Sequence, residues 1–201
     1  MILQINSYGH EILKKKCSSL EYDFLEWQQV INDMWETLDH AHGCGLSAPQ
    51  INLPVKLFIV NSLSVYQSLS DKDREHYFEG DQGIRETFIN ARIIHRSFEK
   101  WIDYEGCLSI PGITEKIERS WSVTIEYENQ SFLKQVETFN GFTARIIQHE
   151  YDHMDGLLYL DHLKPVRRKI LQEKLKRISS GLLPSAYPMK FPEKPNIPEI
   201  L

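Results

Sequence analysis

Two histidines with a glutamate between them form the stretch of this sequence with the clearest chemical potential. The segment QHEYDH at residues 148–153 places His149 and His153 at positions i and i+4, where two imidazoles on one helix face can bind one metal ion. Glu150 follows the first histidine, and from there a carboxylate can take a proton from a water on the metal. The pattern therefore predicts a metal-dependent hydrolase. The competing interpretation is a pair of hydrogen-bonded histidines on a partly buried helix.

A third ligand has to come from elsewhere, because a catalytic divalent ion usually takes three protein ligands and keeps one position for water. A class with a third histidine six residues after the second is excluded, since Tyr159 occupies that position. Glu173 has the spacing of the third ligand in thermolysin-like peptidases, although it lies among basic residues. Cys107, in EGCLSIPG at 105–112, is the other candidate, because thiolate and imidazole together suit zinc or ferrous iron. A non-catalytic structural zinc centre is a third interpretation, but it would need a fourth protein ligand.

The composition is that of a globular chain with one domain: 201 residues, of which 41% are hydrophobic and 25% charged. No apolar run approaches the roughly 18 residues of a membrane span, and the opening MILQINSYGH lacks the pattern of a secretory signal. Three widely spaced cysteines argue against a disulfide framework and favour a reducing compartment. We therefore expect a cytoplasmic protein, with no membrane and no DNA partner.

Helical spacing of apolar residues predicts a helix over 24–42, with Asp23 and Glu26 as a capping box at its start. The histidine motif is expected on a second helix, from Asn140-Gly141 to Asp155, and a third helix is expected from Pro165 to near Gly181. Runs rich in β-branched and aromatic residues predict strands at 56–60, 87–94, 122–128 and 134–139. The expected fold is a compact α+β domain, with mixed or antiparallel strands around a central metal-binding helix and helices near both ends.

Two segments are expected to lie outside this core. Residues 62–85 are polar and rich in Ser, Asp and Gly, so they predict a loop or insertion. Five of the nine prolines fall within 184–198, which predicts that 182–201 is an extended tail. The catalytic domain is accordingly expected to span residues 1–181.

Three motifs, in this order along the chain, resemble those of the peptide deformylase family. They read GCGLSAPQ at 43–50, EGCLS at 105–109 and QHEYDH at 148–153, and the resemblance extends over roughly residues 1–175. Three motifs in order are far more specific than the histidine pattern alone. The resemblance implies a metallohydrolase that removes the N-formyl group from the N-terminal formyl-methionine of nascent polypeptides and releases formate.

The resemblance also implies roles for individual residues. Cys107, His149 and His153 would hold one divalent ion, Fe2+ in the cell, with Zn2+ or Ni2+ as alternatives. Water on that ion would attack the formyl carbon, and Glu150 would act as its general base. Gln50 and the backbone N–H of Leu108 would stabilise the oxyanion.

Further positions gain an interpretation from the same resemblance. Gly45 would let the substrate backbone approach closely, having no Cβ in the way. Arg119 and Asp152 are expected to pair behind the ligands, with an ordinary surface ion pair as the alternative. Ser47 replaces an expected alanine. Positions 103 and 145 of the expected methionine pocket hold Asp103 and Arg145, which would either pair with each other or point outward.

A basic segment lies near the C-terminal end. Residues 164–177 contain seven Lys or Arg and one Glu, in a chain whose net charge is −5. A solvated helix face is the simpler interpretation. In some deformylases the C-terminal helix docks on ribosomal RNA, so the resemblance also implies ribosome binding through these residues.

Overall fold

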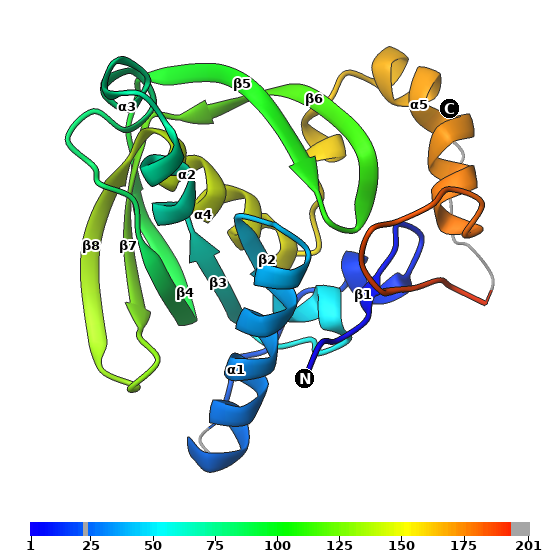
Figure 1. Cartoon of the computed structure of the whole chain (residues 1–201), viewed down its shortest axis with the longest axis horizontal. Helices are drawn as coiled ribbons and strands as arrows, with labels where there is room; N and C mark the ends of the chain where they lie inside the picture. The colour runs from blue at the N-terminus through cyan, green and yellow to red at the C-terminus, as the bar shows by residue number, and fades with distance from the viewer. Residues whose placement is uncertain (22–23, 194–201) are drawn as a thin grey trace.

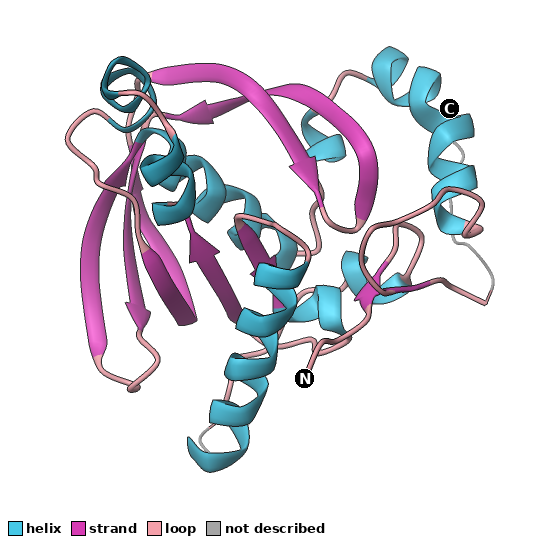
Figure 2. Cartoon of the chain, viewed as in Figure 1, coloured by secondary structure: helices cyan, strands magenta, loops and turns pink. Residues whose placement is uncertain are grey.

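Helix α4 (Gly141–Met154), which carries the histidine motif, lies at the centre of the fold with strands on two sides (Figures 1 and 2). The computed structural model describes residues 1–21 and 24–193, without the side chains of residues 24–26. Asp23 and the side chain of Glu26, predicted as a capping box, lie outside this part. The class is α+β with antiparallel sheets, as predicted.

The remaining elements follow the chain in a simple order. They are β1 (Ile5–Asn6), α1 (Phe24–His40), β2 (Gly45–Ser47), β3 (Leu57–Asn61), α2 (Leu63–Ser68), α3 (Asp71–Phe78), β4 (Arg85–Arg96), β5 (Lys100–Cys107), β6 (Ile110–Ser120), β7 (Ser122–Glu128), β8 (Lys134–Asn140), α5 (Pro165–Ser179) and β9 (Met189–Lys190). Short 3₁₀ turns cover Glu11–Lys14, Ala48–Ile51 and Tyr159–His162. None of the helices among the described residues is long and apolar enough to span a bilayer.

A five-stranded antiparallel sheet, in the order β2-β3-β4-β7-β8, forms one wall of the core. Alternate side chains of its strands point to one face, and α4 packs there through Ala144 and Ile147. Phe58 of β3 and Phe88 of β4 stack beneath the helix with ring centroids 4.7 Å apart, and both are fully buried. Burial of each such side chain stabilises the fold by about 1.5–3 kcal/mol. The sheet therefore fixes where α4 lies.

Helix α1 covers the edge of this sheet that carries β2. Its apolar face, with Ile31, Met34 and Leu38, is fully buried against Leu46 of β2 and Ile59 of β3. The helix ends at His40, two residues before the predicted end, and the four strands predicted from sequence are present as β3, β4, β7 and β8. This packing holds the segment that begins at Gly43 next to α4.

The hairpin of β5 and β6 arches over the other side of α4 (Figure 1) and was not predicted. Its register pairs Gly106 with Thr114 and then shifts, so that Cys107 pairs with Ile110. Ile113 and Ile117 of β6 are buried in a second core cluster, while Thr114 and Lys116 between them are exposed. The shift places Cys107 at the end of β5, where the chain turns beside α4.

Residues 62–85, predicted as a loop or insertion, are not a continuous loop, because the segment holds the two short helices α2 and α3. Ser70 caps α3 by accepting a hydrogen bond from the backbone N–H of Asp73 at 3.3 Å. Phe78 at the end of α3 is fully buried, with its ring 5.9 Å from that of Phe142 on α4. One aromatic anchor thus orders a segment whose other residues are mostly polar.

The described part of the tail, 182–193, contains one short strand, β9, and is bound to the body of the protein. Strand β9 pairs in parallel with β1, with Ile5 opposite Met189 and Asn6 opposite Lys190. Tyr187, two residues before β9, packs against the core cluster that contains α1. The last eight residues, 194–201, lie outside the described part.

Candidate metal centre

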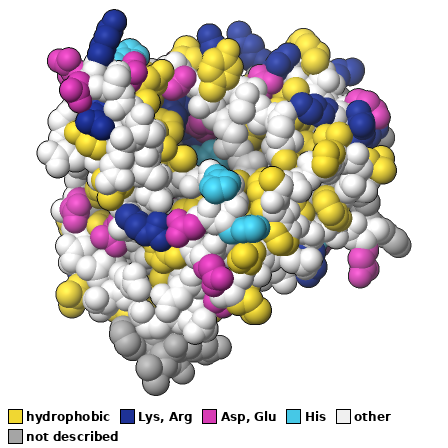
Figure 3. Space-filling view, viewed as in Figure 1, with side chains coloured by type: hydrophobic (Ala, Val, Ile, Leu, Met, Phe, Trp, Pro, Cys, Tyr) yellow, Lys and Arg dark blue, Asp and Glu magenta, His cyan; other side chains and the backbone are white. Residues whose placement is uncertain are grey.

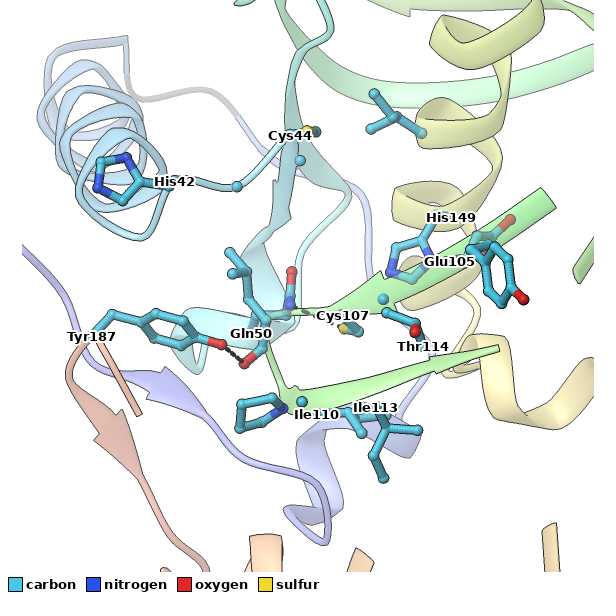
Figure 4. Close-up of a pocket in the computed structure, with 18 of the residues that line it drawn as sticks. His42, Cys44, Gln50, Glu105, Cys107, Ile110, Ile113, Thr114, His149 and Tyr187 are labelled. Carbon is cyan, nitrogen blue, oxygen red and sulfur yellow. Dashed lines mark hydrogen bonds and ion pairs between the residues drawn. The ribbon is translucent and has the colours of Figure 1, made fainter. Parts of the chain in front are cut away.

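Cys107 and the two histidines of α4 converge below the β5–β6 hairpin (Figure 4). Their ligand atoms all lie within 4.8 Å of one another. Sγ of Cys107 is 3.3 Å from Nε2 of His153, and the rings of His149 and His153 stand nearly perpendicular with centroids 5.1 Å apart. Both histidines are buried. A thiolate and two imidazoles facing one point are a donor set that fits a divalent transition metal.

Glu105, two residues before Cys107, orients one of these histidines. Its Oε2 lies 3.1 Å from Nδ1 of His149, so Nε2 is the ring nitrogen left to face Cys107. The same carboxylate accepts two hydrogen bonds from Arg119, both at 2.9 Å, and one from Nη1 of Arg145 at 2.7 Å. The carboxylate of Glu105 thus ties the hairpin to α4 through His149 and Arg145, and Arg119 of β6 holds it from within the hairpin.

Arg119 and Asp152 form the predicted pair, with Nη1 2.6 Å from Oδ2. The alternative of a surface ion pair is wrong, because the two side chains are only 5% and 13% exposed. His162 joins them, with its Nε2 2.7 Å from the same oxygen of Asp152. Arg145 and Asp103 do not form an ion pair: Arg145 points inward to Glu105 and reaches Asp103 only at its backbone oxygen, at 3.4 Å. The guanidinium groups of Arg119 and Arg145 therefore each contact a carboxylate.

The charges of the site follow from burial and from these contacts. Burial alone would raise the pKa of Glu105, but hydrogen bonds from His149 and Arg119 lower it overall. Burial opposes protonation of His149, yet contacts with Cys107 and Glu105 raise its pKa. Burial and the neighbouring His149 lower the pKa of His153. Glu105 thus stays ionised, which suits its role as the acceptor for His149.

The carboxylate of Glu150 lies close to the candidate ligands and has few hydrogen-bond partners. The residue is 3% exposed, and Oε2 is buried without a hydrogen-bond partner among the described residues. Burial raises the pKa of Glu150 to about 7, although the charge of His149 opposes the shift. A carboxyl group with this pKa can both accept and return a proton near neutral pH. An unpartnered buried oxygen is also what a proton acceptor for a water molecule would look like before the water binds.

Gly45 makes room for that carboxylate. A Cβ added at Gly45 would lie 2.4 Å from Oε1 of Glu150, closer than any real contact. The sequence-based expectation gave Gly45 a different purpose, the approach of a substrate backbone. The geometry gives a reason that involves the protein alone: a side chain here would displace Glu150.

Gln50 is held with its amide nitrogen towards the site. Its Oε1 accepts from the backbone N–H of Ser47 at 2.9 Å and from the Ser47 hydroxyl at 3.0 Å. Its Nε2 lies 3.5 Å from Sγ of Cys107 and donates to Oγ of Ser109 at 3.2 Å. Ser47 therefore orients the amide through its oxygen, and the Nε2 end faces the candidate metal ligands (Figure 4).

A cavity of about 480 Å³ opens in front of these groups, within the usual size of small-ligand sites. Its inner end meets Glu150, His149 and Cys107, and one side is apolar through Phe142 and Ile146. Figure 3 shows histidine side chains gathered at the hollow in the centre of this face. The cavity thus brings an apolar wall next to the candidate metal centre.

Comparison with known proteins decides the family. A profile described as "Polypeptide deformylase" matches residues 2–169. This chain belongs to the peptide deformylase family. Peptide deformylases of Christiangramia forsetii and Flavobacterium johnsoniae are each 39% identical to it, over 96% and 95% of this chain and 97% and 96% of theirs.

Solved peptide deformylases have the same fold. The crystal structure from Ehrlichia chaffeensis matches with a TM-score of 0.79 at 26% identity, covering 91% of this chain and all of its own. The structure from Plasmodium falciparum matches with a TM-score of 0.74 at 30% identity, covering 89% and 96%. The predictions of family, of fold class and of a metallohydrolase are confirmed.

Membership in the deformylase family agrees with the choice of third ligand. Glu173, the alternative for a thermolysin-like site, is exposed on α5. Among the described residues, the group of side chains close enough to share an ion is Cys107, His149 and His153. Tyr159, which stands where another class has its third histidine, stacks on the ring of His149 at 5.9 Å.

Sequence reasoning missed two contributors to this deformylase site. The contact of Glu105 with His149 had no signal of its own, although Glu105 lies inside the second motif. The orientation of Gln50 by Ser47 did have one, because Ser-Ala-Pro-Gln at 47–50 has the spacing of a capping box, with proline at the second helical position.

Proposed function

We propose that this chain removes the formyl group from the N-terminal formyl-methionine of nascent polypeptides, with Cys107, His149 and His153 holding one divalent ion. The observation that carries the proposal is their convergence beside Glu150, whose buried Oε2 is without a partner among the described residues. Membership in the deformylase family supports the same reaction.

The donor set fits the ion that this family requires. His149 is oriented through Nδ1, so Nε2 is free to bind, and Cys107 supplies a thiolate. A bound divalent ion lowers the pKa of a water molecule and polarises the formyl oxygen. Thiolate and imidazole suit both Fe2+ and Zn2+, and Fe2+ is the ion that we propose for the cell, with Zn2+ or Ni2+ as substitutes.

The remaining steps are carried by residues of the chain. Glu150 takes a proton from the attacking water at its carboxylate and passes it to the leaving amine, for which a pKa of about 7 is well matched. Nε2 of Gln50 and the backbone N–H of Leu108 donate to the oxygen that gains negative charge as the formyl carbon becomes tetrahedral. Removal of one such donor typically costs about 3–4 kcal/mol of transition-state stabilisation.

The methionine side chain is proposed to enter the apolar side of the cavity, beside Cys44, Phe142 and Ile146. Arg145 does not make this pocket charged, because its guanidinium is buried against the carboxylate of Glu105 and over the ring of Trp101. A charge that is neutralised in this way leaves the cavity wall apolar enough for a thioether.

The direct test is formate release from a formyl-Met-peptide by protein purified without oxygen. Wild-type protein is expected to release formate, and Glu150→Ala is expected to release none while it retains its metal, since the three ligands are unchanged. Cys107→Ser should lose both metal and activity. Fully metallated wild-type protein that releases no formate would overturn the assignment.

Ribosome binding is the second proposal, through the basic residues of 164–177. Lys164, Lys169, Lys176 and Arg177 are exposed on or beside α5, and Figure 3 shows Lys and Arg side chains along the upper right of the molecule, where α5 lies. Arg167 is engaged by Glu115 at 2.7 Å, so it is less available. We expect co-sedimentation with ribosomes that falls steeply with salt.

Charge reversal at Lys169, Lys176 and Arg177 should abolish this co-sedimentation and leave formate release intact. Glu173→Gln on the same helix is the matched control, because it removes a negative charge and should not weaken binding. Co-sedimentation that survives the triple reversal unchanged would refute the ribosome proposal.

A further inference from the structure

The C-terminal segment 182–190, which we call the strap, runs along the body of the protein and reaches the site. Its residues alternate in burial as in a strand, with Leu183 and Tyr187 turned inward. Leu183 packs against the cluster around β6 and α5, whereas Tyr187 packs against the cluster around α1 and β2. The strap therefore bridges two parts of the core.

Its far end is fixed to the N-terminal strand. The backbone N–H of Ile5 donates to the oxygen of Pro188 at 3.0 Å, and that of Ser7 donates to the oxygen of Lys190 at 2.9 Å. Packing at Leu183 and Tyr187 and pairing at β9 hold the strap along its length, so it is not a free tail.

Residues 184–187 of this strap form part of the wall of the catalytic cavity. The match to the family profile ends at residue 169, so this part of the wall lies outside the matched residues. It lies on the side of Gln50 that is away from Cys44 and the apolar pocket (Figure 4). The strap thus borders the oxyanion side of the site.

Tyr187 makes the specific contact. Its hydroxyl donates to the backbone oxygen of Leu108 at 2.8 Å (Figure 4). Burial raises the pKa of Tyr187 to about 12, so the hydroxyl stays protonated and remains a donor at neutral pH. The next peptide is held as well, because the oxygen of Ser109 accepts from the backbone N–H of Tyr8 at 2.8 Å. The turn after Cys107 is thus fixed from outside the hairpin.

We propose that Tyr187 is a positioning residue for deformylation, which holds Leu108 in the backbone conformation that aims its N–H at the oxyanion. The proposal rests on the proposed function, in which that N–H stabilises the transition state. Leu108 lies in a two-residue turn, where rotation about its own backbone bonds would redirect the donor. The hydrogen bond from Tyr187 to the Leu108 carbonyl restricts that rotation. A hydrogen-bond donor that is already oriented before the reaction stabilises the transition state most.

Tyr187→Phe tests this, because phenylalanine keeps the ring in its packing and removes only the hydroxyl. We expect kcat for a formyl-Met-peptide to fall about 3- to 10-fold, the effect of one ordinary hydrogen bond, with KM changed less than about twofold. Tyr66→Phe is the matched control: it removes a hydroxyl from α2, outside the catalytic cavity, and should leave both constants unchanged. Assays are run well below the unfolding temperature of each variant, so that all of them are fully folded.

The split between kcat and KM separates positioning from a structural role. If the strap only adds stability, Tyr187→Phe lowers the melting temperature and leaves kcat within twofold of wild type, which overturns the proposal. A rise in KM with unchanged kcat also overturns it, because it indicates uniform binding of substrate and transition state. Wild-type protein that releases no formate tells against the proposed function instead, so the two failures are distinguishable.

Discussion

Nδ1 of His149 lies 3.1 Å from Oε2 of Glu105, which comes 44 residues earlier in the chain. The contact joins the helix with both histidines to the strand that ends at Cys107. Arg119 and Arg145 hold the same carboxylate from behind, so it cannot turn without breaking several hydrogen bonds. The orientation of the His149 imidazole is therefore set by a carboxylate outside the proposed ligand set.

Glu105→Gln is expected to weaken metal binding by about 10- to 100-fold, the usual effect of losing an outer partner of a ligating histidine. Arg145 also loses its carboxylate partner, while Arg119 keeps Asp152, so the unfolding free energy should fall by about 3–5 kcal/mol. Competition with a chelator measures the affinity, and urea unfolding measures the stability.

Glu118→Gln is the control for that variant, since Glu118 is exposed on the neighbouring strand β6. It should change neither quantity. A Glu105→Gln protein that binds its metal as tightly as wild type would show that the contact with His149 does not orient a ligand.

Removal of the metal is expected to expose one cysteine to alkylation. Cys107 lines the cavity, and a bound ion would occupy its sulfur, so iodoacetamide should modify it at least about tenfold faster after chelation. Cys17 should stay unmodified in either state, because it is 5% exposed and burial raises its pKa to about 11. At pH 8 only about one molecule in a thousand then carries the Cys17 thiolate.

Peptide mass mapping after a short labelling pulse distinguishes the sites. Burial also raises the pKa of Cys44, so this residue should react slowly with and without metal. Equal labelling of Cys107 in the metal-loaded and metal-free protein would argue that its sulfur is not a ligand.

The sequence was most informative where the chemistry is local. His149 and His153 are four residues apart on one helix, so their spacing alone predicted that they share a face. Cys107 is 42 residues before His149, and only its motif linked it to the site. The β5–β6 hairpin that carries it was missed, because the first strand reads Lys-Trp-Ile-Asp-Tyr-Glu and has few of the apolar runs that indicate a strand.

Two further differences from the sequence-based predictions have a common physical cause: in each segment, a single residue packs against the rest of the protein. Residues 62–85 looked like a loop by composition, but burial of Phe78 orders α3. The tail was expected outside the core from its prolines, but Tyr187 packs against the body and donates to Leu108. Neither contact leaves a periodic pattern in the sequence, so neither was accessible to reasoning from spacing.

Phe88→Ala is expected to lower the unfolding free energy by about 3–5 kcal/mol, because it opens a cavity in the core. The ring of Phe88 is fully buried and contacts Phe58 and Tyr127, at centroid distances of 4.7 and 4.3 Å. Phe98→Ala is the matched control, since that ring is 99% exposed, and its cost should stay within about 0.5 kcal/mol. Urea unfolding that finds equal losses for the two variants would contradict this assignment of the core.

Gly45→Ala is expected to lower kcat by about 10- to 100-fold by displacing Glu150, since shifts of about 1 Å in a reacting group have effects of this size. The added Cβ would lie 2.4 Å from Oε1 of Glu150. Gly45 is not among the residues with positive φ, so the backbone conformation permits alanine there. The contact of the new Cβ with Glu150 is then the only expected cause of the loss.

A double-mutant cycle isolates that clash. Gly45→Ala should destabilise the wild-type protein but have little effect in a Glu150→Ala background, where no carboxylate remains to be displaced. Thermal or urea unfolding of the four proteins gives the coupling energy directly. Equal destabilisation in both backgrounds would mean that the contact with Glu150 is not what requires glycine at this position. If the approach of the substrate backbone requires it instead, Gly45→Ala should raise KM.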